Sequence, residues 1–332
     1  MALTFTVNGA VYTVGVERTD VACRLGRKPI YRKFATPEPD FVGKVGQTIQ
    51  FTNHWEPNAI LPGITDNVAL PLRDPTIAAR TVQLLCYGEG REWSVQLLER
   101  SPSTIERAIR EGLADTVARS INLGVGTAMR ATNVYYWPLG APGTEAYGMN
   151  YAATWPVATA TRLMTEADLV FFGTVAGING WKLHKQHGGM NVVVRELNRE
   201  ALLRRMQAFA LAGPPKSLEQ ISGTWDAGQF VAWLHGSAIW YDNTADVLRS
   251  GLAFAGGVVG EEAFFFGENP LVEACVHKGV QMSTYTSPDS RFVRVYMYED
   301  GVGWTLQVNN AGVGAVPPAD INSTCLGIFG DA

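Results

Sequence analysis

The 332-residue chain has few of the features that mark a nucleic-acid-binding, membrane or secreted protein. Its net charge is −4, so the molecule as a whole does not attract nucleic acid electrostatically. No apolar run approaches the ~20 residues that a membrane-spanning helix needs. Residues 1–5 also lack the basic start of a secretory signal. We therefore expect no membrane contact, and a protein that is made and kept in the cytoplasm.

Cysteine is scarce as well. The four cysteines are Cys23, Cys86, Cys275 and Cys325, and no two of them form a C-x-x-C pair. This spacing suits neither a zinc site nor the disulfide framework of a small secreted domain. We expect reduced thiols that are mostly buried.

The signature motifs of common enzymes are missing from the sequence. It contains no phosphate-binding loop G-x-x-x-x-G-K-[ST], no dinucleotide-binding glycine motif after a strand, and no nucleophile elbow G-x-S-x-G. His184 and His187 precede a Gly-Gly pair and favour a surface turn over a metal site. Glu261 and Glu262 are adjacent, and adjacent side chains face apart in helices and strands. We predict no catalytic residue, cofactor or metal, and therefore no enzyme, with an enzyme whose site is built from scattered residues as an alternative.

The chain is instead rich in residues that protein interfaces favour. It has only seven lysines against twenty arginines, with nine Trp and eleven Tyr. Interfaces are enriched in Arg, Tyr and Trp and depleted in Lys and Glu. The composition is typical of a surface that neighbours cover, although ordinary compositional drift explains it equally well.

The first 65 residues predict a hairpin, an arm and a loop. Asn8-Gly9 between two alternating segments predicts a β-hairpin over residues 1–14. Residues 17–40 carry six basic side chains, with Pro37 and Pro39 near the end, which indicates an extended basic arm with little core of its own. Residues 43–65 read as one strand, 47–51, entering a loop broken by Pro and Gly.

The remaining patterns predict an α+β fold without a βαβ repeat. We expect a long helix over 103–123, opened by a capping box at Ser103 and ended by Gly124. Further helices are predicted from Thr165, over 198–212 with Asn198 as the cap, and in a short piece at 227–235. Strands are predicted at 82–86 and 92–97, joined by a turn at Gly88-Glu89-Gly90, and at 133–137 and 190–194. The C-terminal strands, 280–285, 292–298 and 303–308, are separated by turns at 287–289 and Asp300-Gly301.

Several of these segments, taken in order, resemble the major capsid protein of tailed bacteriophages, which has the Hong Kong 97-like shell fold. Residues 43–51 resemble the entry to the family's extended loop, and residues 82–99 the strand pair that follows it. The helix 103–123 falls where the family has its long spine helix. Residues 189–194 and the next helix resemble the axial domain, and Val302-Gly303-Trp304-Thr305-Leu306 with Asn309 resembles the family's closing strand.

The resemblance implies a phage capsid-type fold with a long spine helix, peripheral and axial domains, an N-terminal arm and an extended loop. The expected order is an N-terminal hairpin and basic arm (1–40), the extended loop (41–80) and a peripheral domain with the spine helix (81–160). An axial domain (161–265) and C-terminal strands returning to the peripheral domain (266–332) complete it.

The resemblance also implies the function: self-assembly of pentamers and hexamers into an icosahedral shell that encloses double-stranded DNA. Expected partners are copies of the chain, a scaffold, a decorating or cement protein, and packaged DNA by non-specific contact. The expected location is the virion, assembled in the cytoplasm of the bacterial host. Another phage structural protein, of the tail or cement type, is the alternative.

The arm and the loop tip supply the predicted intersubunit contacts. Segments without a core gain order by lying on another surface. For the arm, a solvated run of charge and contact with DNA phosphates are alternatives. The predicted contact residues are Arg24, Arg27, Lys28, Arg32, Lys33, Trp55 and Glu56.

Overall fold

The computed structural model describes about two thirds of the chain in separate ranges. These are 3–7, 10–14, 30–38, 48–55, 76–96, 104–132, 134–139, 146–151, 162–178, 190–212, 230–234, 237–242, 244, 246–253, 259–268, 270–276, 279–286, 289, 291–306, 308–309, 321–322 and 324–331.

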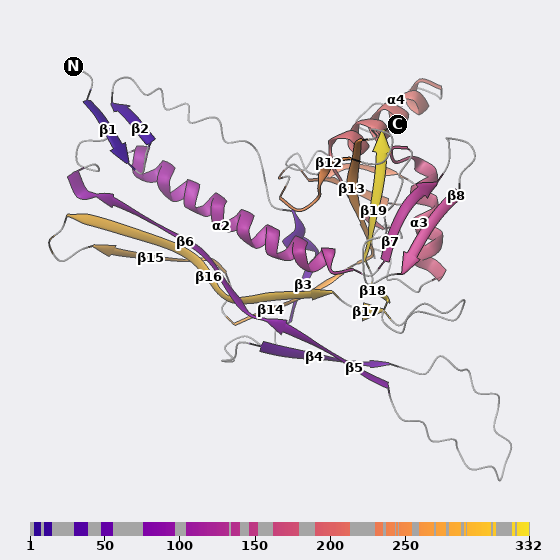
Figure 1. Ribbon diagram of the computed structural model, residues 1–332, viewed down its shortest axis with the longest axis horizontal. Coiled ribbons are helices and arrows are strands. Elements are labelled where there is room, and N and C mark those ends of the chain that lie inside the picture. The colour runs from indigo at the N-terminus through magenta and orange to yellow at the C-terminus, as the bar shows by residue number, and fades with distance from the viewer. Residues whose placement is uncertain are drawn as a thin grey trace, which may run out of the picture.

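A five-stranded sheet and the long helix that lies along it form the first part of the fold (Figure 1). The sheet order is β15 (Gln281–Thr286), β16 (Phe292–Leu306), β14 (Leu271–Cys275) and β3 (Ala35–Glu38), with β6 (Leu85–Ser94) on the other side of β16. Helix α2 (Thr104–Arg130) runs along β6 and β16 and buries Leu113 against Trp93 and Val295. Figure 1 shows this layer as the elongated part of the molecule.

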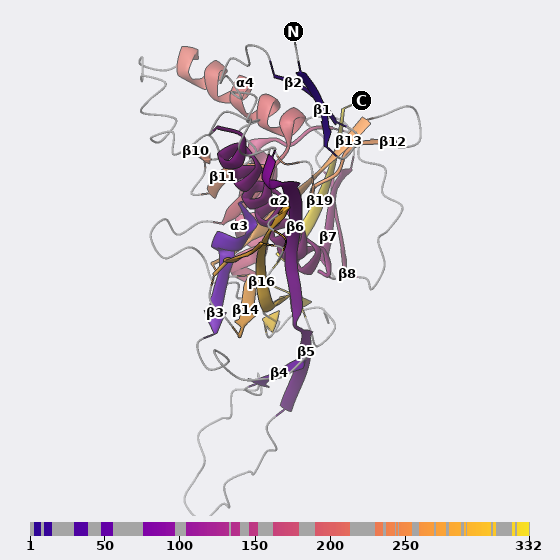
Figure 2. The ribbon, with the colours of Figure 1, turned by 90° about the vertical axis from the view of Figure 1, so that its left-hand side faces the viewer.

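An eight-stranded mixed sheet forms the second part of the fold. Its order is β10 (Phe230–Leu234), β11 (Ser237–Tyr241), β9 (Asn191–Val194), β13 (Val259–Phe266), β19 (Thr324–Asp331), β7 (Val134–Leu139) and β8 (Ala146–Tyr151), with β12 (Ser250–Ala253) paired to β13. Helices α3 (Glu166–Ile178) and α4 (Glu196–Ala212) lie beside it (Figures 1 and 2).

Both faces of the eight-stranded sheet are buried, which explains why its central strands are almost wholly apolar. Phe265 of β13 packs on one face with Phe172 of α3, and the two rings stack at 3.7 Å between centroids. Phe264 and Phe266, its neighbours in sequence, point to the other face and pack with residues from the C-terminal half of α2. The sheet therefore joins two hydrophobic cores through one strand.

The long helix expected over 103–123 is present, but Gly124 does not end it. Helix α2 continues through Gly124 and Gly126 to Arg130. A Cβ at Gly124 would lie 2.9 Å from the Trp304 ring, and one at Gly126 would lie 2.3 Å from a methyl group of Val247. These glycines let neighbouring side chains approach the helix closely, a role that the local sequence pattern does not reveal. Ser103 lies outside the described residues.

The turns expected at Gly88-Glu89-Gly90 and Asp300-Gly301 are also wrong. Both lie within continuous strands, β6 and β16, which pair antiparallel with one another. A Cβ at Gly88 would come within 2.5 Å of the Cβ of Tyr298, so glycine is needed there for the approach of the two strands. Gly301 has a φ of +66° and lies at a shift in the pairing register, where a bulge bends β16.

Two other predictions are wrong in detail. Residues 230–234 form strand β10 where a short helix over 227–235 was expected. Asn198 does not cap α4, which begins at Glu196; the side-chain oxygen of Asn198 instead accepts a hydrogen bond from Met164 N at 2.9 Å. The predicted helix from Thr165 and the strand 190–194 are confirmed as α3 and β9.

Three two-stranded sheets complete the described structure. The N-terminal hairpin is confirmed as β1 (Leu3–Val7) and β2 (Ala10–Val14), with Val7 opposite Ala10. Strands β4 (Thr48–Trp55) and β5 (Thr76–Gln83) form a hairpin that projects from the body in both views (Figures 1 and 2). The third pairs β17 (Val308–Asn309) with β18 (Ile321–Asn322).

The sheets do not follow the domain ranges expected from the sequence. Strands β7 and β8 fall in the range 81–160, yet they belong to the eight-stranded sheet with strands of the range 161–265. Strand β19 also belongs to it, although its residues lie in the range 266–332. Pairing between distant segments is not visible in local patterns. Among the described helices, none has the length and apolar character to span a membrane.

Candidate intersubunit surfaces

The end of the predicted basic arm is anchored in the core, which corrects the expectation of an arm without a core over all of residues 17–40. Ile30, Tyr31 and Phe34 are buried with residues of α2, β13 and β14. Tyr31 and Phe34 are the ends of a short 3-10 helix that leads into β3 (Ala35–Glu38). Strand β3 then pairs parallel to β14. The apolar residues of this stretch lie among basic ones, so composition alone hid them.

Polar contacts fix this anchor from two sides. The side-chain oxygen of Asn122 in α2 accepts hydrogen bonds from the backbone N–H groups of Ile30 and Tyr31, at 3.0 and 3.1 Å. The Tyr31 hydroxyl donates to Asp242 at 2.7 Å. Burial, together with the nearby Asp242 carboxylate, raises the pKa of Tyr31 well above its ordinary value, so the hydroxyl stays a donor.

Arg32 forms the strongest part of the anchor. Its guanidinium donates to Glu273 at 3.0 and 2.8 Å and to Glu299 at 2.6 Å twice. Hydrogen bonding to Glu299 is the main cause that raises the pKa of Arg32, so the group stays charged. The indole N–H of Trp304 also donates to Glu273, at 2.8 Å. One side chain therefore joins the start of β3 to β14 and β16 by paired, charge-assisted hydrogen bonds.

Lys33 also contacts its own chain. Its ammonium group lies 3.4 Å from the centroid of the Trp240 ring and 5.1 Å from that of Phe34, in cation–π geometry. Of the seven predicted contact residues, the structure describes the side-chain contacts of Arg32 and Lys33. The two are neighbours, and both make these contacts within the subunit. The backbone of Trp55 ends β4 opposite Thr76. Arg24, Arg27, Lys28 and Glu56 lie outside the described residues, so an intersubunit role for the set stays a prediction.

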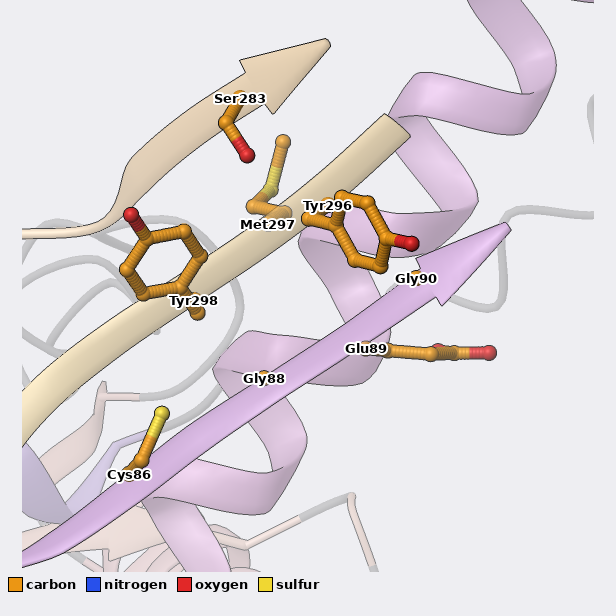
Figure 3. Close-up of a pocket in the computed structure, with 8 residues that line it drawn as sticks. All are labelled: Cys86, Gly88, Glu89, Gly90, Ser283, Tyr296, Met297 and Tyr298. Atoms are coloured by element: carbon orange, nitrogen blue, oxygen red, sulfur yellow. The ribbon is translucent and has the colours of Figure 1, made fainter. Parts of the chain in front are cut away.

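The outer face of the five-stranded sheet carries an open trough that the sequence reading missed (Figure 3). Gly88 and Gly90 of β6 lie opposite Tyr298 and Tyr296 of β16, as Figure 3 shows. Alternation along 292–298 was the available signal, because it places Phe292, Tyr296 and Tyr298 on one face. The full lining is Cys86, Gly88, Glu89, Gly90, Ser283, Tyr296, Met297 and Tyr298.

The trough lacks the grouping that acid–base or nucleophilic catalysis needs. Its thiol, Cys86, is exposed, but partial loss of hydration and the nearby Asp300 carboxylate raise its pKa, so the reactive thiolate is disfavoured. Aromatic faces with few charges are typical instead of a surface for protein contact.

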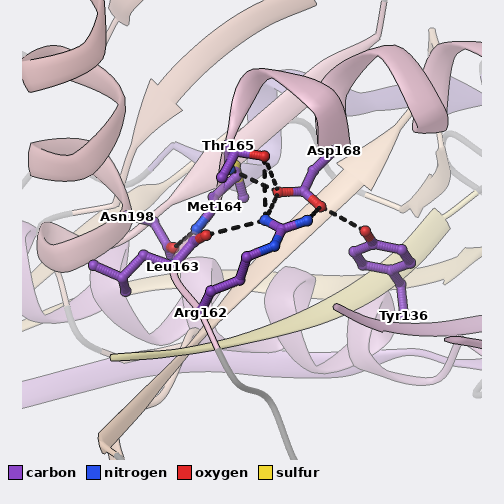
Figure 4. Close-up of polar contacts among 7 residues, drawn as sticks. All are labelled: Tyr136, Arg162, Leu163, Met164, Thr165, Asp168 and Asn198. Atoms are coloured by element: carbon purple, nitrogen blue, oxygen red, sulfur yellow. Dashed lines mark hydrogen bonds and ion pairs between the residues drawn. The ribbon is translucent and has the colours of Figure 1, made fainter. Parts of the chain in front are cut away.

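A buried ion pair beside α3 has all of its carboxylate oxygens hydrogen-bonded by neighbouring groups. Asp168 accepts hydrogen bonds from Arg162 at 2.6 and 2.9 Å and from the Tyr136 hydroxyl at 2.6 Å (Figure 4). It also accepts from the N–H of Thr165 at 2.6 Å, which closes the first turn of α3. The T-x-x-D spacing was the signal for this contact in the sequence. Every oxygen of Asp168 is occupied, so the cluster holds the fold together and offers no free carboxylate.

Glu261 and Glu262 face apart, as predicted. Glu261 accepts a hydrogen bond from the backbone N–H of Asn198 at 3.1 Å, on the α4 side of β13. Glu262 is fully buried and pairs with Arg130 of α2 and with Arg249. Glu262 thereby ties the end of α2 to the eight-stranded sheet.

The described residues contain no group of three or more His, Cys, Asp or Glu side chains placed to hold a metal ion. The two histidines singled out from the sequence, His184 and His187, lie outside those residues, as does Cys23. Cys275 and Cys325 are buried, whereas Cys86 is exposed.

Comparison of the whole fold with solved structures finds capsids. The capsid of Ralstonia phage GP4 is similar with a TM-score of 0.66 and 10% identity, over 96% of this chain and 95% of that chain. The capsid of cyanophage P-SCSP1u gives a TM-score of 0.61 and 9% identity over 98% and 97%. The capsid of cyanophage Pam1 gives 0.57 and 15% over 89% and 88%.

Comparisons of the sequence find no matching family model and no matching curated protein. Because identities of 9–15% lie far below those at which sequence carries function, the likeness concerns the fold. The α+β class predicted from the sequence patterns and the capsid-type fold implied by the resemblance are both confirmed. The protein has the fold of phage capsid proteins.

Proposed function

We propose that the chain is a major capsid protein that self-assembles into a closed icosahedral shell around double-stranded DNA. One observation carries the proposal: similarity to the GP4 phage capsid runs over 96% of the chain, so the likeness concerns the whole subunit and not one part of it. A fold shared in part would be weaker support, because folds host unrelated functions. The role is structural, built on many subunit contacts and on no reacting group.

The two sheets supply the two parts of such a subunit. We assign the peripheral role to α2 with the five-stranded sheet, and the axial role to the eight-stranded sheet with α3 and α4. Glu262 and the shared core around Phe264 and Phe266 hold the two parts together. The projecting β4–β5 hairpin takes the role of the extended loop (Figure 2).

The arm that reaches a neighbour is shorter than the sequence suggested. Because Ile30–Phe34 are packed into the subunit, residues 1–29 are the part available for a contact with another copy. Arg24, Arg27 and Lys28 fall in this part, and Trp55 with Glu56 in the extended loop. Arg32 and Lys33 fix the end of the arm to its own subunit.

The further partners follow from the role and are part of the proposal. They are copies of the chain in pentamers and hexamers, a scaffold, a decorating or cement protein, and packaged DNA touched without base recognition. Assembly takes place in the bacterial cytoplasm, and the product is a component of the virion.

Negative-stain electron microscopy of the purified, overexpressed chain tests the proposal. Closed shells, or tubular polyheads made of the same hexamers, are expected. Tubes of a tail-like lattice would favour the tail alternative, and small uniform oligomers under all assembly conditions would contradict a shell role and reopen the enzyme alternative.

Two deletions separate the arm from its anchor. Removal of residues 1–29 should leave a folded subunit that does not close shells. Removal of residues 1–33 should also destabilise the subunit, because it takes away Ile30, Tyr31 and Arg32. Circular dichroism and thermal melting report the fold, and electron microscopy reports the shells. Normal particles from the first variant would refute the role of the arm.

A further inference from the structure

Strand β15 leaves one side of the five-stranded sheet open. It pairs with β16 through six successive residues, from Gln281 opposite Tyr298 to Thr286 opposite Val293, and it ends the sheet. No other strand among the described residues pairs with it. Its outer edge therefore presents a row of backbone donors and acceptors that another strand can use.

Among the described residues, this edge lacks the devices that proteins use to block strand addition. Such edges carry charged side chains, a proline or a bulge, or are covered by another element. Strand β15 reads Gln-Met-Ser-Thr-Tyr-Thr, keeps a regular register with β16, and all six of its residues are exposed. Thr, Tyr and Met suit a pleated, half-buried strand. The edge is therefore able to pair with another strand.

Apolar side chains on both faces gain from a neighbouring strand. Met282 is 50% exposed on the α2 side of the sheet, and Tyr285 is 49% exposed on the outer side. The two faces follow from the register, because Met282 lies opposite Met297 and Tyr285 opposite Arg294. A strand added at the edge would cover part of each.

We propose that β15 pairs antiparallel with β15 of a second copy of the chain, about a two-fold axis perpendicular to the sheet. This inference rests on the proposed function, since it names one contact of the shell. The absence of charge favours a second copy as the occupant: a two-fold contact sets each residue against itself or a near neighbour, where like charges would repel. Six neutral residues in a row meet that requirement.

The geometry restricts the register of the pair. Such an axis keeps the two faces of the joined sheet aligned, so each residue lies opposite one of the same face. The central residues of β15 are Ser283 and Thr284, and the axis passes beside one of them. Either register sets hydroxyl side chains together at the centre, with Tyr285 or Met282 nearby.

The contact is one of many small ones in a shell. Pairing of six residues per copy is far below the roughly 1,600 Å² of a standard stable interface. We therefore expect no stable dimer of free subunits, and a contact that multivalency makes effective in an assembled particle.

Disulfide cross-linking tests the pairing directly. Ser283→Cys and Thr284→Cys are introduced separately into a background in which Cys23 and Cys86 are replaced by Ser. Oxidation of assembled particles should give disulfide-linked dimers for at least one of the two. Thr174→Cys, on an exposed position of α3, is the matched control and should remain monomeric on a non-reducing gel. Absence of dimers at both β15 positions in well-formed particles would overturn the proposal.

Charge substitution gives a second, independent test. Lys and Glu are introduced separately at Ser283 and at Thr284, and at the position beside the axis each should reduce the yield of particles about tenfold, because like charges then lie opposite one another. An equal mixture of the Lys and Glu variants at that position should recover the yield. Thr174→Lys should assemble as the unmodified chain does. Normal assembly of the Lys and Glu variants at both Ser283 and Thr284 would refute the pairing.

Failure of the pairing can be told apart from failure of the shell proposal. If the unmodified chain forms no particles, the shell role fails, and the pairing, which is proposed as a contact of the shell, fails with it. If well-formed particles are obtained and neither Ser283→Cys nor Thr284→Cys gives dimers, the pairing alone fails.

Discussion

Arg32 is held by contacts within its own subunit that the sequence did not reveal. The run of basic residues predicted a contact with another subunit, whereas the structure satisfies Arg32 with Glu273 and Glu299 of its own chain. These carboxylates lie more than 240 residues away in sequence. No local pattern connects them, so the ion pairs could not be predicted.

Removal of the Arg32 charge should destabilise the subunit. Arg32→Ala leaves Glu299, which is fully buried, and Glu273 without their cation. Breaking a buried ion pair costs about 3 kcal/mol of unfolding free energy. Chemical denaturation of the unassembled subunit measures it. Arg204→Ala, which breaks an exposed pair with Glu200, is the control and should change stability by less than about 0.5 kcal/mol. Equal effects of both would contradict the anchor.

Glu261 makes stability depend on pH. Burial raises the pKa of Glu261 above its ordinary value, more than the backbone hydrogen bonds from Leu197 and Asn198 lower it. The folded state therefore holds the proton more tightly than the unfolded state, and the carboxylate lowers stability as pH rises above 4.5. Glu261→Gln should be at least as stable as the unmodified chain at pH 7, with the advantage shrinking as pH falls toward 4. Thermal melting across this range measures it, and an advantage that grows on acidification would contradict it.

At the scale of elements, glycine was the least reliable signal for the end of a helix or strand. Gly88, Gly124 and Gly301 all predicted a turn or a helix end, and each lies inside a continuous element. Tertiary packing explains these glycines, because each lies where a neighbouring strand or side chain approaches the backbone closely. Elements with strong periodicity, such as the helix from residue 104, were predictable because their pattern depends only on neighbours in sequence.

Two glycines of α2 should respond in opposite ways to the same substitution. Gly112→Ala gains helix propensity, worth up to about 1 kcal/mol, and its Cβ meets only Arg91 at 3.8 Å. Gly126→Ala forces a Cβ against Val247 and should cost about 1–3 kcal/mol through overpacking. Chemical denaturation of both variants measures the pair. Stabilisation by both would show that α2 does not pack as described.

A second pair tests the strand contact beneath the trough. Gly88→Ala sets a Cβ against the Cβ of Tyr298, which cannot move without the backbone. Gly90→Ala meets only the Tyr296 ring, which is exposed and can rotate away. We expect Gly88→Ala to lower the thermal midpoint clearly and Gly90→Ala to change it little. The reverse order would contradict the register of β6 with β16.

At the scale of the whole molecule, the order of segments was more informative than any one of them. The loop entry at 43–51, the long helix, the strand 190–194 with its helix and the closing strand together predicted a capsid-type fold, which is confirmed. The division of the strands into sheets could not be predicted, because β19 pairs with both β13 and β7, and β7 lies far from β19 in the sequence. Long-range pairing of this kind is set by the assembled core, not by local propensity.

The most direct test of the account is the mass distribution of the purified, full-length chain under assembly conditions, measured by sedimentation velocity. A subunit made for a closed shell should pass from monomers or capsomers to one narrow, very large species as concentration rises, with few intermediates. A chain that stays monomeric, or stops at a small fixed oligomer at every concentration and salt condition, would contradict the shell account.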